Sequence, residues 1–164
     1  MVGKRMLDEI NEQIKLELES AYIYLAMSAA MSDQGWDGMA SWLEKQAGEE
    51  VAHAMKFYKH LIERGARVEL HAIAKPQKEW SSPLAAFKGA YEHEKFVTGR
   101  INHMMEVARE EKDNPAQSLL QWFVDEQVEE EDQTLKVVTA LEKIGDSTGA
   151  LFMLDHNLGK RGDD

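Results

Sequence analysis

The sequence predicts an all-α protein, a four-helix bundle with one long crossover connection and a short fifth helix towards its C-terminus. Three observations predict this fold. Long stretches rich in Ala, Leu, Glu, Lys, Met and Gln, with few β-branched residues, favour helix over strand. Apolar residues recur in these stretches at spacings of three and four, which is typical of a helix with one buried face. The 164 residues, 43% of them hydrophobic, suffice for a single domain with a full core, spanning residues 1–164.

The helix positions follow from the breakers and from pairs of a capping residue with proline. Ser82-Pro83 and Asn114-Pro115 each combine an N-cap residue with proline at the first helical position, so they predict the starts of the third and fourth helices. The predicted helices span residues 5–33, 37–64, 83–111, 115–143 and 147–158. The first four have about 28 residues each, or about 42 Å, a normal length for a bundle.

The lengths of the connections predict how the helices pair. Residues 33–36 and 112–114 are short links, so the first two helices form one antiparallel hairpin and the next two form another. Residues 65–82 are too long for a tight turn and can run the length of the bundle. The fifth helix, which lies outside the four-helix core, carries the apolar residues Leu151, Phe152, Met153, Leu154 and Leu158. We expect it to be buried in contacts between subunits, with burial on its own bundle as the alternative.

Composition and charge exclude several partners and sites. Thirty Asp and Glu against nineteen Lys and Arg give a net charge of −11, which repels a phosphate backbone, so we expect no nucleic-acid partner. The absence of cysteine leaves carboxylate, imidazole and carbonyl groups as the available metal ligands. No apolar run approaches the ~20 residues that cross a bilayer, and residues 1–13 lack an apolar leader segment. We therefore expect no membrane partner and a cytoplasmic location.

Polar residues interrupt the apolar row of every bundle helix. The predicted inward rows are Leu7, Ile10, Ile14, Glu17, Ala21 and Leu25 in the first helix, and Met39, Leu43, Gln46, Glu50, His53, Phe57 and Leu61 in the second. Those of the third and fourth are Phe87, Ala90, Glu94, Val97 and Ile101, and Ala116, Leu120, Phe123, Gln127, Glu130, Thr134, Val137 and Leu141. The polar members lie near the midpoint of each helix, where antiparallel helices meet at one level.

Four carboxylates at one buried level require compensation, because each ionised carboxylate in apolar surroundings costs several kcal/mol. A multiply charged cation supplies that compensation. A dinuclear site in a bundle takes single Glu residues from two helices and Glu-x-x-His from the other two. The residues that fit this pattern are Glu17, Glu50, His53, Glu94, Gln127 and Glu130. The fourth helix supplies Gln-x-x-Glu in place of a second Glu-x-x-His, so we predict an asymmetric metal site with one imidazole.

Five segments resemble those of a known family. They are residues 11–17 (NEQIKLE), 20–24 (SAYIY), 49–53 (EEVAH), 91–94 (YEHE) and 123–131 (FVDEQVEEE). With these segments the chain resembles the bacterial and archaeal non-haem ferritins over almost its whole length, and the fold expected is the ferritin-like bundle. The resemblance implies a ferroxidase that oxidises Fe(II) with O2 at an intrasubunit diiron centre. It also implies deposition of Fe(III) mineral inside a protein shell, for iron storage.

The resemblance implies a role for each site residue. It assigns Glu17 and His53 to one iron, Glu94 and Glu130 to the other, Glu50 to the bridge between them, and Gln127 to the side where oxygen binds. It places a third, outer iron site at Glu49, Glu126, Glu129 and Glu130. Residues 125–132 contain six acids, for which a solvated helix face is the alternative. Tyr24 is expected near the centre, as an electron donor or as a packed aromatic residue.

Three other classes of protein are alternatives to a non-haem ferritin. A haem bacterioferritin carries Met directly after the Glu of Glu-x-x-His, where this chain has Val51, so we expect no haem. A diiron peroxidase commonly adds a domain with four cysteine ligands, which this chain lacks. A metal-free structural or signalling bundle is the alternative outside enzymes. We expect Trp122 to pack rather than transfer electrons, and we expect surface or packing roles for His60, His71, His93, His103 and His156.

Storage requires a container that one bundle cannot form. The resemblance implies a homo-oligomeric shell of 24 subunits, with Fe2+ and O2 as the small partners and iron as the only cofactor.

Overall fold

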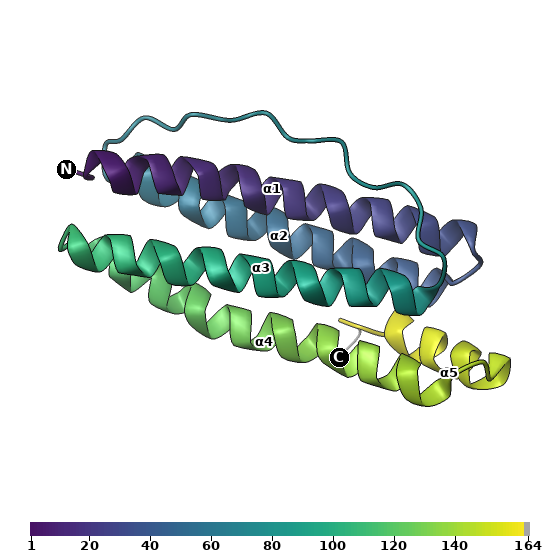
Figure 1. Ribbon diagram of the computed structural model, residues 1–164. Coiled ribbons are helices and arrows are strands. Elements are labelled where there is room, and N and C mark those ends of the chain that lie inside the picture. Colours follow the sequence, from purple (N-terminus) through teal and green to yellow (C-terminus); the bar gives the residue numbers. More distant parts are fainter. Residues whose placement is uncertain (163–164) are drawn as a thin grey trace.

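The computed structural model describes residues 1–162, which form an all-α bundle of five helices (Figure 1). The helices are α1 (Lys4–Asp33), α2 (Asp37–Glu63), α3 (Pro83–Glu110), α4 (Asn114–Ile144) and α5 (Thr148–Gly159). The predicted fold class is confirmed, and each helix ends within one residue of its predicted limits. The single-domain prediction also includes residues 163 and 164, which lie outside the described residues.

The helices pair as the connection lengths predict. α1 packs against α2 and α3 against α4 as two hairpins, and α1 also contacts α3. Figure 1 shows the crossover between α2 and α3 running along the outside of α1 from one end of the bundle to the other. Three hydrogen bonds attach it to α1 and its turn. Glu69 N donates to Asn11 Oδ1 at 3.0 Å, Gln34 Nε2 donates to Trp80 O at 2.8 Å, and His71 Nδ1 lies 3.0 Å from Glu12 Oε2. In the described residues no helix is long and apolar enough to span a membrane.

The two predicted N-caps have different outcomes. Ser82 caps α3 as predicted, and its Oγ accepts a backbone hydrogen bond at 3.1 Å. The prediction of Asn114 as the cap of α4 is wrong, because the cap is Asp113 and the helix begins at Asn114. Asp113 Oδ1 accepts from Ala116 N at 3.0 Å, and its Oδ2 accepts from Arg64 at 2.9 Å. One carboxylate oxygen caps the helix while the other pairs with the guanidinium, and the N-cap is therefore one residue earlier than predicted.

The inward row of α1 differs from the predicted row at both ends. Leu25 is 47% exposed and Leu7 is only half-buried, whereas Met6, Tyr24 and Met31 are fully buried. From Ala21 a step of three residues reaches Tyr24, whereas the predicted row took a second step of four and reached Leu25. Strict alternation of three and four therefore follows the buried face, and the added residue turns the row towards solvent.

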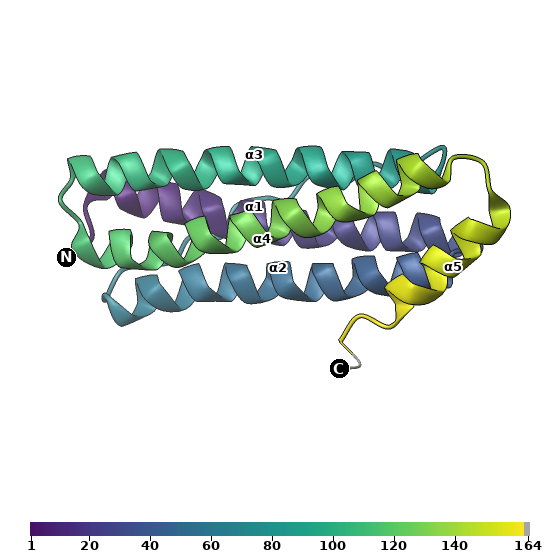
Figure 2. The same ribbon diagram turned by 90° about the horizontal axis from the view of Figure 1, so that it is seen from below.

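α5 packs on its own bundle with one face only. It contacts α2 and α4, across whose ends it lies in Figure 2. Leu151, Leu154 and Leu158 are partly buried against the apolar core. Phe152 and Met153 are 58% and 70% exposed on the other face. Burial on its own bundle therefore holds for one face of the helix, and burial of the exposed face in contacts between subunits stays a prediction.

The apolar core of the bundle is divided into two clusters. One contains Tyr24, Leu43 and Phe87, and the other contains the stacked rings of Phe57 and Phe123, whose centroids are 4.1 Å apart. Between the two clusters lie the polar residues that interrupt the apolar rows. The fold therefore places a polar layer at the middle of an apolar bundle.

Candidate metal centre

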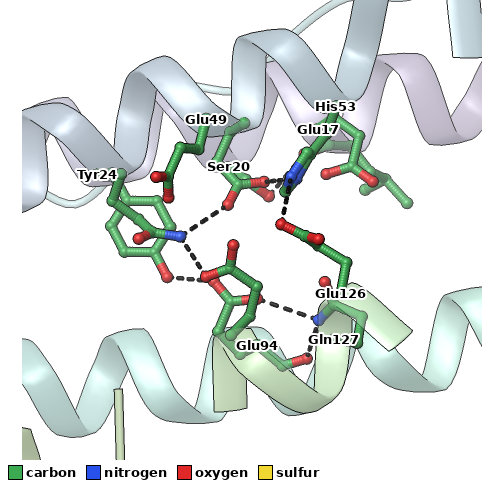
Figure 3. A network of polar contacts seen from close by, with 12 residues as sticks. Glu17, Ser20, Tyr24, Glu49, His53, Glu94, Glu126 and Gln127 are labelled. Carbon is green, nitrogen blue, oxygen red and sulfur yellow. Dashed lines mark hydrogen bonds and ion pairs between the residues drawn. The ribbon is translucent and has the colours of Figure 1, made fainter. Parts of the chain in front are cut away.

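The six residues predicted for the centre lie together in this polar layer (Figure 3). All are at most 4% exposed: Glu17 from α1, Glu50 and His53 from α2, Glu94 from α3, and Gln127 and Glu130 from α4. They meet because each sits on the inward face near the midpoint of its helix. Every bundle helix thus contributes at least one side chain.

Within the described residues, three groups of acids and histidine are close enough to hold a metal ion. In each group the ligand atoms lie within 4.8 Å of one another, and the groups are Glu17, Glu50 and His53; Glu50, Glu94 and Glu130; and His53, Glu126 and Glu130. The first two groups share Glu50, which is the arrangement of a carboxylate between two cations. Geometry therefore offers two adjacent cation positions, with one imidazole at the first.

Two glutamines hold carboxylates of the layer in place. Gln13 Nε2 donates to Glu17 Oε1 at 2.9 Å, one turn along α1. Gln46 Nε2 donates to Glu50 Oε1 at 3.3 Å and to Glu130 Oε2 at 2.5 Å, linking α2 to α4. Gln46 was part of the predicted row, but Gln13 was missed. Its position four residues before Glu17 on the same helix face was the available signal.

Glu94 receives donors from two other helices. The Tyr24 hydroxyl donates to Glu94 Oε1, and Gln127 Nε2 donates to Glu94 Oε2 at 3.1 Å (Figure 3). The Gln127 amide also reaches the backbone oxygen of Glu94 at 3.2 Å and Thr98 Oγ1 at 3.3 Å. Tyr24 thus lies beside the centre as predicted. Gln127 presents its amide nitrogen to Glu94 in this arrangement.

His53 links the inner carboxylates to an acid nearer the surface. Its Nδ1 lies 3.4 Å from Glu50 Oε2, and its Nε2 lies 3.5 Å from Glu126 Oε1. The edges of Trp122 and Phe123 pack on the imidazole, with ring centroids at 5.6 and 5.8 Å. These contacts give Trp122 a packing role at the wall of the site.

Burial dominates the electrostatics of the layer. It raises the pKa of Glu17 well above its usual value, and the neighbouring Glu50 charge raises it further. Burial, with the charges of Glu94 and Glu130, also raises the pKa of Glu50 well above its usual value. For Glu94, burial raises the pKa although Tyr24 and Gln127 donate to the carboxylate. For Glu130, burial and then the Glu94 charge raise the pKa to about 8.

The layer fits a divalent cation. Glu17 Oε2 is buried and has no hydrogen-bond partner among the described residues, so one strong acceptor faces the site unsatisfied. The donor set is carboxylate oxygen with a single imidazole, which suits Fe(II) and similar first-row ions. A bound cation would replace the protons that burial favours on these carboxyl groups.

The residues predicted for an outer site are spread more widely. Glu126 shares a group with Glu130, but Glu49 and Glu129 are exposed and join none of the three groups. Glu49 instead pairs with Arg161, with 2.6 Å between Oε2 and the guanidinium. The outer site therefore stays a prediction, and the structure brings together only Glu126 and Glu130 of its four residues.

The other histidines lie away from the centre. None of the five, which are His60, His71, His93, His103 and His156, belongs to a group of potential metal ligands within the described residues. His71 and His103 contact surface acids, Glu12 at 3.0 Å and Glu9 at 3.1 Å.

A four-helix bundle with one long crossover and a buried layer of Glu with a single His defines a ferritin-like, metal-binding class of protein. Comparison with known proteins agrees. A family model described as "Ferritin-like domain" matches residues 7–144. The chain belongs to the ferritin family.

Individual relatives match over nearly the whole length. A bacterial non-heme ferritin of Staphylococcus aureus (strain USA300) is 37% identical over 161 residues, 98% of this chain and 97% of that protein. One of Bacteroides fragilis (strain 638R) is 35% identical, over 98% of this chain and 100% of that protein. Among solved structures, an open pore ferritin from the hyperthermophilic archaeon Archaeoglobus fulgidus is 44% identical, with a TM-score of 0.97 over 98% of this chain and 99% of that one.

Proposed function

We propose that the chain is a ferroxidase that oxidises Fe(II) with dioxygen in the polar layer and stores the product as mineral inside a shell of identical subunits. Membership of the ferritin family supports iron storage. One observation carries the finer proposal. Glu50 belongs to two adjacent groups of buried ligands, so two iron ions can be held side by side with a shared carboxylate.

The residues divide the work as follows. Two Fe(II) ions enter as substrate, one at Glu17, Glu50 and His53 and the other at Glu50, Glu94 and Glu130. Binding displaces the protons that burial holds on the carboxyl groups, so the charge of the layer stays near neutral. Each iron then gives one electron, so one dioxygen molecule receives two electrons. Hard carboxylate donors favour the Fe(III) that results, and the surrounding apolar clusters limit access of water.

Tyr24 and Gln127 act at Glu94 in this proposal. Both donate to its carboxylate and hold it towards the second iron position. Tyr24 is in addition placed to donate an electron, since its hydroxyl touches a ligand. The alternative is a packed aromatic residue without a role in the reaction, in which case Tyr24→Phe leaves the oxidation kinetics unchanged.

Glu126 offers a way out of the centre. Its carboxylate is half-buried and lies close to His53 and Glu130, whereas Glu129, in the next turn of α4, is exposed. We propose that iron leaves through Glu126 to the outer acids. If Glu126→Gln oxidises and releases iron as the parent does over repeated additions of Fe(II), this route is excluded.

The shell is proposed from the family and from the exposed apolar face of α5. Phe152 and Met153 project from the single chain, which fits contact with neighbouring subunits. The expected assembly has 24 subunits. Analytical ultracentrifugation tests it, and a persistent monomer would remove storage while leaving oxidation possible.

The central experiment compares the parent with Glu50→Ala and His53→Ala. Fe(II) is added aerobically to the chelator-treated protein, and the ferric absorbance is followed at about two irons per chain. We expect the rate of the fast phase to fall by about 100-fold in both variants, because each substitution removes a proposed iron ligand. Glu106→Ala, at an exposed position on α3, is the matched control. Equal rates in all four proteins would mean that the site is wrongly assigned, and failure of the parent itself would favour the metal-free bundle.

A further inference from the structure

Arg161 brings the C-terminal segment back onto the bundle beside the polar layer. In Figure 2 the chain reverses direction between α4 and α5, and the segment that follows α5 lies on the α2 side of the bundle. The Arg161 side chain is only 18% exposed, and its guanidinium carbon lies 4.5 Å from the centroid of the Trp42 ring. Arg161 lies outside residues 7–144, which the family model matches, and it has no role in the proposed oxidation.

Four hydrogen bonds fix the guanidinium in place. One terminal nitrogen donates to Gln46 Oε1 at 2.9 Å and to the Trp42 backbone oxygen at 3.4 Å. The other donates to Glu49 Oε2 at 2.6 Å and to Gln133 Oε1 at 3.2 Å. A planar guanidinium can make such contacts in a fixed fork, which a lysine cannot reproduce.

The contact with Gln46 matters most, because Gln46 is fully buried and touches two carboxylates of the centre. A side-chain amide has an accepting oxygen and a donating nitrogen. Since Arg161 holds the oxygen, the nitrogen must face the other way, where it donates to Glu50 Oε1 and Glu130 Oε2. With the amide reversed, its oxygen would face two carboxylates and repel them.

We propose that Arg161 is a positioning residue of the metal centre, which sets the orientation of the Gln46 amide and so holds Glu50 and Glu130 ready for a cation. The proposal rests on the proposed function only in taking these carboxylates as ligands. Loss of the guanidinium frees the amide to rotate and removes the shared donor from the two carboxylates. Cation affinity then falls, although no ligand has been changed.

The test uses anaerobic Co(II), which reports both affinity and coordination geometry through its visible absorption. In Arg161→Met the apolar stem can still pack on Trp42. We expect this variant to bind Co(II) about tenfold more weakly with an altered absorption spectrum, which is the low end of the loss for residues that orient metal ligands. Lys160→Met, at the exposed preceding position, is the matched control and is expected to match the parent.

Two double-mutant cycles test whether Arg161 affects Co(II) binding through Gln46 or through its ion pair with Glu49. In a Gln46→Ala background, Arg161→Met should cause no further loss, because the group through which it acts has been removed. In a Glu49→Gln background, which removes the ion pair and leaves Gln46 unchanged, the full loss should persist. An undiminished effect in Gln46→Ala, or an effect abolished by Glu49→Gln, would overturn the proposal. Circular dichroism and sedimentation check folding and assembly, and Arg161→Ala replaces Arg161→Met if the latter does not fold.

Failure of this proposal can be told apart from failure of the proposed function. If the parent binds Co(II) and Glu50→Ala abolishes binding, the centre stands. Equal affinity and spectrum of Arg161→Met and the parent then refute positioning alone. If the parent binds no Co(II), the proposed centre itself is refuted.

Discussion

Glu130→Gln should stabilise the metal-free protein at alkaline pH while weakening its metal centre. Glu130 is 2% exposed, and burial together with the charge of Glu94 raises its pKa from 4.5 to about 8. Glutamine has nearly the same shape and can still accept the hydrogen bond from Gln46, but it carries no charge. The substitution therefore removes the cost of ionising a buried carboxyl group and little else.

The size of the effect follows from proton linkage. The folded protein holds a proton on Glu130 over a pH range in which the unfolded chain has lost it, so the stability of the parent falls as pH rises. The fall begins near the unfolded pKa of about 4.5, continues at about 1.4 kcal/mol per pH unit and ends near pH 8. The whole range amounts to at most about 5 kcal/mol. We expect the variant and the parent to be similar near pH 4 and to differ by several kcal/mol above pH 8.

Urea unfolding of the chelator-treated proteins at a series of pH values measures this difference. Protein concentration is kept constant, because assembly contributes to apparent stability. Glu106→Gln, which replaces an exposed glutamate that makes no ion pair among the described residues, is the control and should follow the parent at every pH. With added Co(II) the parent should become more stable than Glu130→Gln, since the cation stabilises the parent more than the variant. Parallel pH curves for Glu130→Gln and the parent would refute the claim that burial of Glu130 destabilises the metal-free bundle.

Two further substitutions test the scaffold. Asp113→Ala removes the cap of α4 and the ion pair with Arg64, so we expect a loss of about 2 kcal/mol in urea unfolding. An unchanged midpoint would contradict the capping role. Gly48→Ala should raise stability by about 1 kcal/mol, because an added Cβ on this exposed turn of α2 meets no atom within 4 Å. A melting temperature higher by about 2–4 °C is the expected result, and a decrease would show that the glycine is needed for packing.

The raised pKa values explain why a stability cost persists in the middle of this protein. A layer of apolar residues in place of Glu17, Glu50, Glu94 and Glu130 would join the two apolar clusters into one core. Burial instead raises the pKa of all four carboxyl groups, which favours their neutral form. In the proposed function, an arriving cation replaces the protons on these groups.

Much of the fold and of the centre could be predicted because the signals are local. The periods of three and four place Glu50 and His53 on one face, and the link lengths determine which helices form hairpins. Interruption of all four rows near mid-helix then predicts a shared polar layer, which the structure contains. The error at Leu25 arose from the same signal, since after Ala21 the predicted row took a step of four residues where a step of three reaches the buried Tyr24.

The remaining features depend on how one helix is rotated against another, and no local period encodes that rotation. Tyr24 meets Glu94 across 70 residues of sequence, and Arg161 meets Gln46 across 115. The same rotation turns Glu126 inward to His53 and leaves Glu49 to the C-terminal segment. By itself, the sequence determined the all-α class, the pairing of the helices and the six polar residues that meet in the buried layer. Only the tertiary structure decided which donors hold the carboxylates of that layer, because side chains that are distant along the chain meet only after the helices have packed.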